Sequence, residues 1–238
     1  MTDSIDGLIS AVREETDRAA FPIDEPVYRR WGRDPKDPIL FAGTLEASLC
    51  IVGRDLGKDE VSAGQPMIGA AGRLVRAGIL KAFASREAAE LAVPGQPPLQ
   101  EALKYAVLTN TVPYKPPGNK AYAEGVRRRF RPLLARLLTQ YWKGDQVITL
   151  GSEAFQWFEP YLDADEWNAF GGSDRRFETI FHCRLPATGG PETKDKEVLV
   201  YPLPHPSPLN RRWYSRFPEM LAGRLADVLQ RTAKSPRM

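Results

Sequence analysis

The sequence predicts an α/β fold: a three-layer αβα sandwich with a central four-stranded, mainly parallel sheet. Four short apolar runs, at residues 47–53, 105–110, 146–151 and 198–203, are typical of buried parallel strands. Apolar residues at helical spacing fill the stretches between them, and this alternation favours a parallel sheet with helices on both faces. A chain of 238 residues can bury a full core, so we expect a single domain over residues 1–238.

The first part of the chain is expected to lie against this domain. Residues 3–20 fit a polar amphipathic helix with Ile5, Leu8 and Val12 on one side. The proline-rich run at 21–38 predicts an ordered, extended segment that crosses the surface.

Further helices are expected between and after the strands. Helical spacing covers residues 68–83 and 124–141, and Ser152 after Gly151 predicts a helix N-cap. A final helix is expected around residues 221–229.

Three other segments complete the predicted order. Phe177–Arg184 is a candidate edge strand, and residues 186–197 have the composition of an exposed loop. The last residues, 233–238, are expected to fray.

Composition excludes several classes of protein. The apolar fraction of 42% and the charged fraction of 26% are ordinary for a globular protein. No apolar run approaches the roughly 20 residues of a membrane helix, and the acidic, polar N-terminus is no signal peptide, so we expect a cytoplasmic protein. A net charge of +3 is compatible with nucleic acid but does not select it. The two cysteines, Cys50 and Cys183, are too few for a disulfide framework or a cysteine-only metal cage.

Polar residues follow three of the predicted strands. Gly53–Gly57 reads Gly-Arg-Asp-Leu-Gly after the first strand, and Asn110 ends the second. His205 follows the fourth strand in the rigid loop Pro204–Asn210, which reads Pro-His-Pro-Ser-Pro-Leu-Asn. Because parallel strands end at one edge of a sheet, Asp55, Asn110 and His205 have the layout of an active site on an open α/β sheet.

These segments together resemble the uracil-DNA glycosylase superfamily, over roughly residues 47–217. His205–Leu209 is similar to the second signature motif of the family 1 enzymes, and Gly53-Arg54-Asp55 to their Gly-Gln-Asp motif. Gly64–Gly72 instead resembles the glycine-rich run of the family 4 enzymes. Thr109-Asn110 followed by Lys115–Asn119 is also similar to family 4. The chain therefore combines features of two families.

The resemblance implies a role for each site residue. Asp55 would stabilise positive charge on the sugar and orient a water molecule, and His205, acting neutral, would stabilise the anion forming on uracil. Asn110 would read the base through its amide. Leu209 would fill the space left by the flipped nucleotide, as an apolar wedge does. Phosphates would be held by three polar residues of the same region, Ser207, Arg211 and Arg212.

Each residue also has a plain structural reading. Asp55 can be a turn or cap residue, and Asp59 and Glu60 are nearby acidic alternatives. His205, Asn110 and Leu209 can be ordinary loop residues, because such residues are common after strands. The other histidine, His182, is expected on the edge strand, away from the site.

Three positions depart from the family patterns, and all are expected to line the base pocket. Met67 stands where family 4 carries a stacking aromatic residue, and Gly57 stands where family 1 carries a tyrosine that excludes thymine; family 4 also has glycine there, with other pocket walls as the alternative means of exclusion. Arg54 replaces the Gln of family 1 and the Glu of family 4. A roomier and less discriminating pocket is therefore expected.

The resemblance implies a cofactor-free enzyme. Family 4 enzymes carry an iron–sulfur cluster on four cysteines, but here Tyr114 occupies one aligned position and the N-terminal region has no cysteine. We therefore expect no metal and no iron–sulfur cluster. None of the three motifs contains a lysine, so no lyase step through a Schiff base is expected.

The expected function is that of a monomeric, monofunctional uracil-DNA glycosylase in base excision repair. It would flip uracil, and some other deaminated or damaged bases, out of DNA and leave an abasic site. It would be nucleoid-associated when acting. One alternative is a non-catalytic DNA-binding protein of the same fold that recognises abasic or damaged sites. Another is a sugar- or nucleotide-modifying α/β enzyme, against which the sequence has neither a phosphate loop nor a dinucleotide fingerprint.

Overall fold

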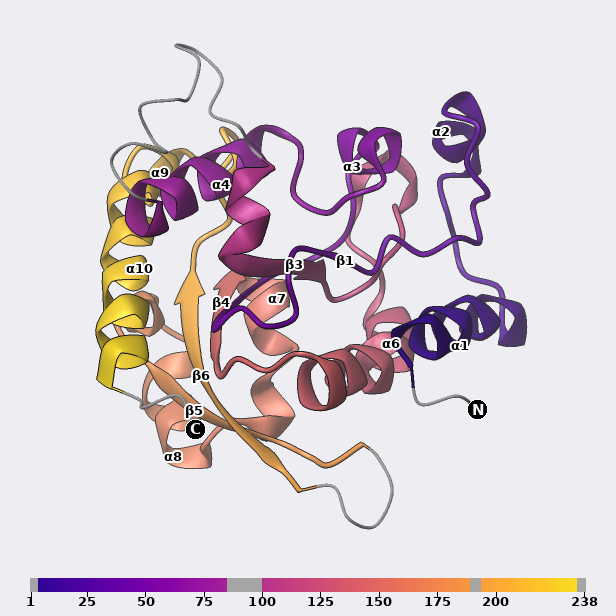
Figure 1. The fold of residues 1–238 in the computed structure, drawn as a ribbon. Coiled ribbons are helices and arrows are strands. Elements are labelled where there is room, and N and C mark those ends of the chain that lie inside the picture. Colours follow the sequence, from indigo (N-terminus) through magenta and orange to yellow (C-terminus); the bar gives the residue numbers. More distant parts are fainter. Residues whose placement is uncertain (1–3, 85–99, 189–193, 235–238) are drawn as a thin grey trace.

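A six-stranded sheet crosses the centre of the protein in the order β1-β3-β2-β4-β6-β5, and helices cover both of its faces (Figure 1). The structure is a computed structural model that describes residues 4–84, 100–188 and 194–234. The strands are β1 (Phe41–Ala42), β2 (Leu49–Gly53), β3 (Ala106–Asn110), β4 (Gln146–Leu150), β5 (Phe181–Leu185) and β6 (Lys196–Leu203).

The four central strands β3, β2, β4 and β6 are parallel, and the edge strands β1 and β5 are antiparallel to their neighbours. This confirms the three-layer fold and the four predicted parallel strands. The candidate edge strand at 177–184 is present as the shorter β5, Phe181–Leu185, and the two-residue β1, which was not predicted, joins the other edge. Strand β1 is too short to leave a periodic signal in the sequence.

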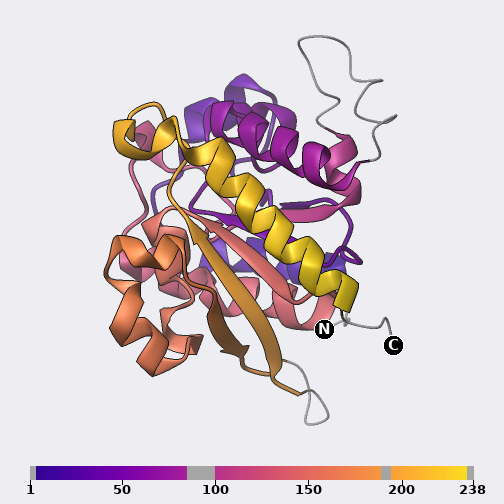
Figure 2. The same ribbon diagram turned by 90° about the vertical axis from the view of Figure 1, so that its left-hand side faces the viewer.

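Every residue of β2, β3 and β4 is buried, which explains why these strands are mostly apolar; the buried polar exceptions are Thr109 and Asn110 in β3 and Gln146 and Thr149 in β4. On one face of the sheet lie α1 (Ile5–Arg18), α6 (Glu124–Arg136) and α7 (Ser152–Gln156). On the other face lie α4 (Ala70–Phe83) and α10 (Phe217–Lys234), which pack against each other (Figure 2). Cys50 and Cys183 are both buried free thiols among the apolar residues of the first face.

The remaining helical segments are short. They are α2 (Glu25–Arg30), α3 (Lys58–Ala63), η1 (Glu101–Lys104), η2 (Pro117–Asn119), η3 (Leu137–Tyr141), η4 (Glu159–Tyr161), α8 (Ala164–Glu166), η5 (Trp167–Gly171), η6 (Asp174–Phe177) and α9 (Arg211–Tyr214). The predicted helix 124–141 is therefore continuous, with η3 as a terminal π-helical turn. No helix in the described ranges is both long and apolar enough to span a bilayer.

Several predicted boundaries are wrong. The segment 21–38 is not extended throughout, because Pro26 sits in the first turn of α2, where a missing N–H costs nothing. Ser152 is the first helical residue instead of the N-cap, which is Gly151 at a φ of 92°. Strand β6 begins at Lys196, inside the predicted loop.

At the C-terminus, α10 continues through Lys234, so the described part of the predicted frayed end is helical. The rest of that end, residues 235–238, lies outside the described residues, as do 189–193 of the predicted loop and residue 3 of the first helix.

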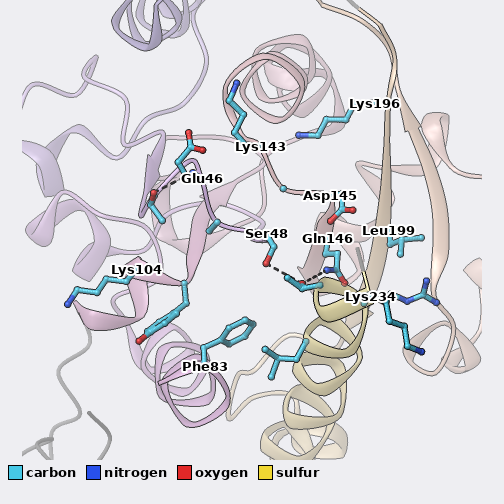
Figure 3. Close-up of a pocket in the computed structure, with 17 residues that line it drawn as sticks. Glu46, Ser48, Phe83, Lys104, Lys143, Asp145, Gln146, Lys196, Leu199 and Lys234 are labelled. Carbon is cyan, nitrogen blue, oxygen red and sulfur yellow. Dashed lines mark hydrogen bonds between the residues drawn. The ribbon is translucent and has the colours of Figure 1, made fainter. Parts of the chain in front are cut away.

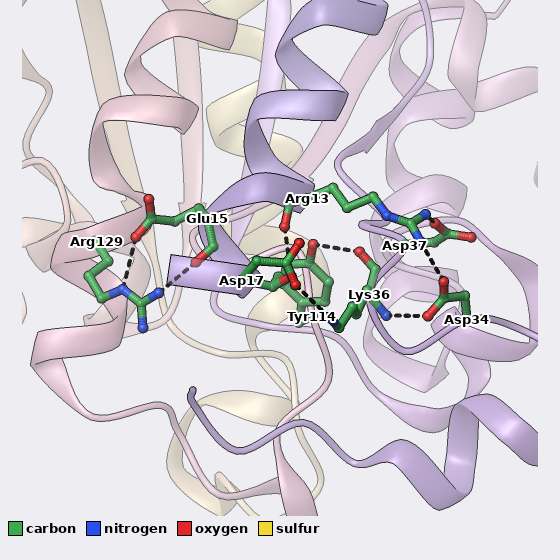
Figure 4. A network of polar contacts seen from close by, with 9 residues as sticks. Arg13, Glu15, Asp17, Asp34, Lys36, Asp37, Tyr114 and Arg129 are labelled. Atoms are coloured by element: carbon green, nitrogen blue, oxygen red, sulfur yellow. Dashed lines mark hydrogen bonds and ion pairs between the residues drawn. The ribbon is translucent and has the colours of Figure 1, made fainter. Parts of the chain in front are cut away.

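Charged contacts tie α1 to the segment that follows it and to α6 (Figure 4). Arg13 forms ion pairs with Asp34, at 2.6 Å, and with Asp37. Lys36 Nζ lies 2.5 Å from Asp17 Oδ1. On the α6 side, Arg129 Nε donates to Glu15 Oε1 at 3.0 Å. These pairs, together with buried Leu8 and Val12, hold the N-terminal helix against the sheet layer.

A substitution in α4 tests how closely this helix approaches the loop before it. A Cβ on Gly72 would lie 2.0 Å from the carbonyl carbon and oxygen of Met67, so Gly72→Ala must move backbone. We expect it to lower the free energy of unfolding by about 1–3 kcal/mol, as overpacking does. The measurement is urea denaturation followed by circular dichroism.

Gly223→Ala in α10 is the matched control, because a Cβ there meets nothing within 4 Å. It should raise stability by about 0.5–1 kcal/mol, the helix preference of alanine over glycine. Equal stabilities for the two variants would show that Met67 and Gly72 are not in the close contact described.

Candidate active site

The carboxyl ends of β2, β3 and β6 bring the predicted site residues to one end of the sheet. Gly53 at the end of β2 faces Asn110 at the end of β3 in the parallel register. Strand β6 ends at Leu203, whose carbonyl accepts the N–H of Gly151 at 2.8 Å, and His205 follows two residues later. The structure therefore places the segments that carry Asp55, Asn110 and His205 at the same edge.

The backbone around Asp55 is held by hydrogen bonds that continue past the end of the sheet. The N–H of Thr111 donates to the Gly53 carbonyl at 2.9 Å, and that of Val112 donates to the Arg54 carbonyl at 3.3 Å. The Thr111 hydroxyl donates to the same Arg54 carbonyl at 2.5 Å. The Gly-Arg-Asp segment is thus a fixed extension of the β2–β3 pair.

Asp55 is a buried carboxyl group with a perturbed pKa. Its side chain is 7% exposed, and burial raises its pKa to about 6. Arg54 acts in the opposite direction, because its Nε lies 3.0 Å from Asp55 Oδ2. Glu153 on α7 adds a like charge that raises the pKa further. A carboxyl group whose pKa is perturbed by burial and by specific charged neighbours is a candidate for a functional role, which supports a catalytic role over that of a cap residue.

His205 lies beside the same charges. Its loop is closed by two bonds to its own carbonyl, from the Ser207 N–H at 2.9 Å and from Asn210 Nδ2 at 3.1 Å. A Cβ on Gly151 would lie 3.2 Å from the His205 Cβ, so the glycine admits the histidine. The residue keeps an exposed edge, but the surrounding protein desolvates the ring and, with Arg54, lowers its pKa.

Arg54 therefore acts on both candidate catalytic groups. Its positive charge lowers the pKa of Asp55 and the pKa of His205, which favours a carboxylate and a neutral imidazole at the same pH. Glu153 Oε1 lies 3.7 Å from Arg54 Nη1 and opposes both effects. The sequence analysis did not select Glu153, although its place just after β4, the remaining parallel strand, is a signal that could have found it.

Asn110 carries an unsatisfied donor. The residue is 3% exposed, and its Nδ2 has no hydrogen-bond partner among the described residues. A Cβ on Gly53 would lie 2.3 Å from Asn110 Oδ1 and 3.3 Å from the methyl group of Met67. Only glycine at position 53 leaves room for the amide beside Met67. A buried, unpaired amide N–H is suited to a ligand that supplies a carbonyl acceptor.

Met67 sits in a preformed loop. It is the single non-glycine residue of the described ranges with a positive φ, 56°. The fully buried Arg76 donates through Nε to the Met67 carbonyl at 2.9 Å. Glu60 Oε1 accepts the N–H groups of Ile68 and Gly69, both at 2.8 Å. A non-glycine residue keeps a left-handed conformation only where its surroundings hold it there. For Met67, the hydrogen bonds of Arg76 and Glu60 to the backbone of this loop do so.

These contacts also decide the role of Glu60. Its second oxygen, Oε2, accepts the Gly57 N–H at 2.9 Å, so both oxygens serve the backbone. Glu60 is therefore a framework residue and not the acidic alternative to Asp55. Arg76, like Glu60, hydrogen-bonds the backbone of this loop. The sequence analysis did not select it, although an arginine inside an apolar helix is a signal that could have found it.

The structure corrects the argument from Gly57. A Cβ on Gly57 would lie 2.5 Å from Glu60 Oε2, so the Cβ direction is already filled. The missing tyrosine therefore leaves no open space on that side. Tyr122 lies near Asp55 instead, brought there by the segment before α6. It is 3% exposed, its hydroxyl has no partner within the described residues, and no sequence motif pointed to it.

The His205 loop presents the predicted DNA-contacting residues at the surface. Leu209 is 94% exposed, which rules out the reading that it packs on the domain. Ser207 Oγ accepts the Leu209 N–H at 3.3 Å and so shapes the loop. Arg211 is exposed, whereas Arg212 pairs with Asp174 at 2.5 Å and its guanidinium lies 4.6 Å from the Trp213 ring.

Two other features lie away from this edge. His182 is on β5, where Nδ1 is 2.7 Å from Glu166 Oε1. A cavity of about 1120 Å³ lies at the opposite ends of the strands, lined by residues that include Ser48, Gln146 and Lys196 (Figure 3). It contains none of the candidate catalytic residues. Within the described ranges, no group of three or more His, Cys, Asp or Glu side chains is placed to hold a metal ion.

Comparison with known proteins agrees with the geometry. A family model described as the uracil DNA glycosylase superfamily matches residues 41–229, from β1 into α10, and this span includes every site residue named above. A search of curated proteins finds no match to the sequence.

Arg54→Gln should raise the pKa of His205, because it removes a positive charge that disfavours the imidazolium. Glu153→Gln should lower it, because it removes a negative charge. The chain has two histidines, so NMR titration of the imidazole signals measures this directly, with His182→Gln to assign them. Unchanged titration in both variants, or shifts of the same sign, would contradict the assigned electrostatics.

Proposed function

Since the chain belongs to the uracil-DNA glycosylase superfamily, we propose that it hydrolyses the N-glycosidic bond of uracil in DNA and leaves an abasic site. One observation carries this proposal. A buried carboxyl, a neutral-favoured imidazole and an unpaired amide donor follow three parallel strands at one edge of the sheet. Superfamily membership supports DNA N-glycosylase chemistry in base excision repair, and these residues supply the groups that uracil excision needs.

The first requirement is a flipped base, because the glycosidic carbon is unreachable inside a stacked duplex. Leu209, exposed on a loop closed by its own hydrogen bonds, is suited to fill the space that the nucleotide leaves. The unpaired Nδ2 of Asn110 would then donate to the uracil O4, and its Oδ1 would accept the N3–H. Met67 would contact the base as an apolar wall.

The second requirement is stabilisation of charge as the bond breaks. The electron pair of the N1–C1′ bond leaves with uracil, and a hydrogen bond from His205 to O2 stabilises the resulting anion. Asp55 stabilises the positive charge on the sugar. It also orients the water molecule whose oxygen bonds to C1′, and it accepts the proton that this water loses. A pKa of about 6 keeps Asp55 ionised, and able to act as a base, at neutral pH.

The remaining parts of the proposal concern scope. We propose a monofunctional, cofactor-free enzyme, since the three strand-end segments that carry Asp55, Asn110 and His205 contain no lysine for a lyase step and the chain has no four-cysteine cage; we also propose that it is a monomer and acts in the cytoplasm. Uracil should be the best substrate, with weaker excision of some deaminated or enlarged bases, because recognition rests on the Asn110 amide. Paired thymine should be spared, because flipping a correctly paired base costs a few kcal/mol more than flipping a mismatched one.

A specific observation favours one alternative, a non-catalytic protein that binds abasic or damaged DNA. Arg54 Nε is 3.0 Å from the Asp55 carboxylate, and such an ion pair opposes use of the carboxylate as a base. Release of uracil from a labelled oligonucleotide under single-turnover conditions separates the two functions. The same oligonucleotide with thymine in place of uracil is the control.

Asp55→Asn should lower the single-turnover rate of base release by on the order of 10²-fold or more, because it removes a charge used mainly in the transition state. Binding to uracil-containing DNA should persist. The wild-type rate should also fall as the pH drops through about 6, where Asp55 becomes protonated. A variant that keeps more than about a third of wild-type turnover would reassign the catalytic carboxylate.

His205→Ala should reduce the rate of base release by on the order of 10²-fold, because one preplaced donor is lost. His182→Ala is the matched control, since that ring is held on β5 by Glu166. A larger loss in the His182 variant would show that the site has been placed at the wrong histidine.

A further inference from the structure

Two large apolar side chains are exposed among the described residues, Leu209 and Trp31. The proposed function uses Leu209 and leaves Trp31 without a role. Half of the Trp31 surface, 51%, is open to solvent. Trp31 also lies before residue 41, outside the span matched by the family model. It is therefore a feature of this chain's own N-terminal segment.

The backbone holds Trp31 in a rigid position at the end of α2. The carbonyl of Tyr28 accepts the N–H groups of Trp31 and Arg33, both at 3.0 Å. Gly32 adopts a φ of 65°, the left-handed geometry that closes a helix end. Tyr28 is fully buried, and its hydroxyl accepts the N–H of Lys115 at 3.0 Å. A ring on such a fixed support loses little conformational entropy when it binds a flat partner.

The surroundings of Trp31 are basic. The Arg30 guanidinium lies 5.8 Å from the centroid of the indole ring. Arg29 and Arg33, two residues before and two after Trp31 in the chain, are exposed; Arg29 pairs with Glu25 at 2.6 Å, and Arg33 Nη2 donates to the Ser62 carbonyl at 3.5 Å. An exposed aromatic ring among arginines is the combination that binds unpaired nucleotides, the ring by stacking and the arginines through phosphates.

The position of Trp31 relates it to the candidate active site. Helix α2 packs against α3, and a Cβ on Gly64, just after α3, would lie 2.4 Å from Arg33 Nη2. From Gly64 the chain runs three residues to Met67 in the base pocket. In Figure 1, α2 and α9 both lie toward the end of the molecule to which β6 points, on opposite sides of it. The segments that carry Trp31, just after α2, and Leu209, just before α9, therefore lie toward the same end of the protein.

We propose that Trp31, with Arg30 and Arg33, binds an unpaired base of the DNA strand outside the flipped nucleotide. This inference rests on the proposed function. Bases in an intact duplex are stacked on each other and do not offer a free face, so the contact forms with single-stranded or gapped DNA. The protein therefore binds uracil-containing single strands in preference to the same sequence in a blunt duplex.

The test is fluorescence anisotropy with a labelled, uracil-free single strand and with its blunt duplex. Trp31→Ala should weaken single-strand binding by on the order of tenfold, the loss of one base–aromatic stack. Its effect on the duplex should be several-fold smaller. Trp31→Phe should keep most of the single-strand affinity, and circular dichroism checks that both variants fold.

The charge contribution has its own matched pair. Arg30→Gln should weaken single-strand binding and reduce its salt dependence, because a phosphate contact is lost. Arg184→Gln is the control, since Arg184 lies on β5 opposite the start of β6, away from the candidate active site, and pairs with Asp195 at 3.0 Å. It removes the same charge and should leave single-strand affinity nearly unchanged.

Equal losses on single strand and duplex, or unchanged affinity in Trp31→Ala, would overturn the inference. Uracil release by the wild-type protein is a separate measurement. If the protein releases uracil but Trp31→Ala does not change its affinity for single strands, this inference alone is refuted. A protein that binds single strands through Trp31 but releases no uracil refutes the glycosylase proposal alone.

Discussion

The parallel pairing of β2 with β3, in which Gly53 faces Asn110, is the constraint on which the site depends. Hydrogen bonds from Thr111 and Val112 carry this pairing past the sheet edge and fix the segment that ends in Asp55. The absence of a Cβ at Gly53 makes room for the Asn110 amide. One backbone register therefore positions both the Asp55 carboxyl and the Asn110 amide that we propose to read the base.

Opposed charges define the chemistry of this edge. Burial raises the pKa of Asp55, and Arg54 moderates that rise while it lowers the pKa of His205. The positive charge of Arg54 thus favours an ionised Asp55 and a neutral His205 at the same pH. These are the protonation states that the proposed mechanism uses. A second pair of buried charged residues, Glu60 and Arg76, hydrogen-bonds the backbone of the segment from Gly57 to Gly69. Two carboxylates, Asp55 and Glu60, and two arginines, Arg54 and Arg76, therefore differ in role because they contact different groups.

The end of the protein that we propose to bind DNA carries two exposed apolar side chains. Leu209 projects from a loop closed by hydrogen bonds within residues 205–210, and Trp31 projects from a helix end fixed by the Tyr28 carbonyl. Both are apolar groups on rigid supports, so their exposure is maintained by the backbone around them. The ion pairs of α1 with Asp34 and Asp37 stabilise the segment that carries Trp31. The N-terminal helix is thereby linked to the proposed substrate-binding end.

The sequence by itself determined the layer architecture, the four parallel strands and the strand ends that carry Asp55, Asn110 and His205, because strands buried on both faces are short and mostly apolar. It did not reveal β1, α2, the start of the helix at Ser152 or the start of β6 at Lys196. These features depend on contacts with residues distant in the sequence and leave no local periodic pattern. Only the tertiary structure decided that Glu60 supports the backbone, that Gly57 leaves no gap and that Glu153 and Tyr122 lie near Asp55. Such contacts join residues distant in sequence, and their energies come from burial and charge that no local pattern records.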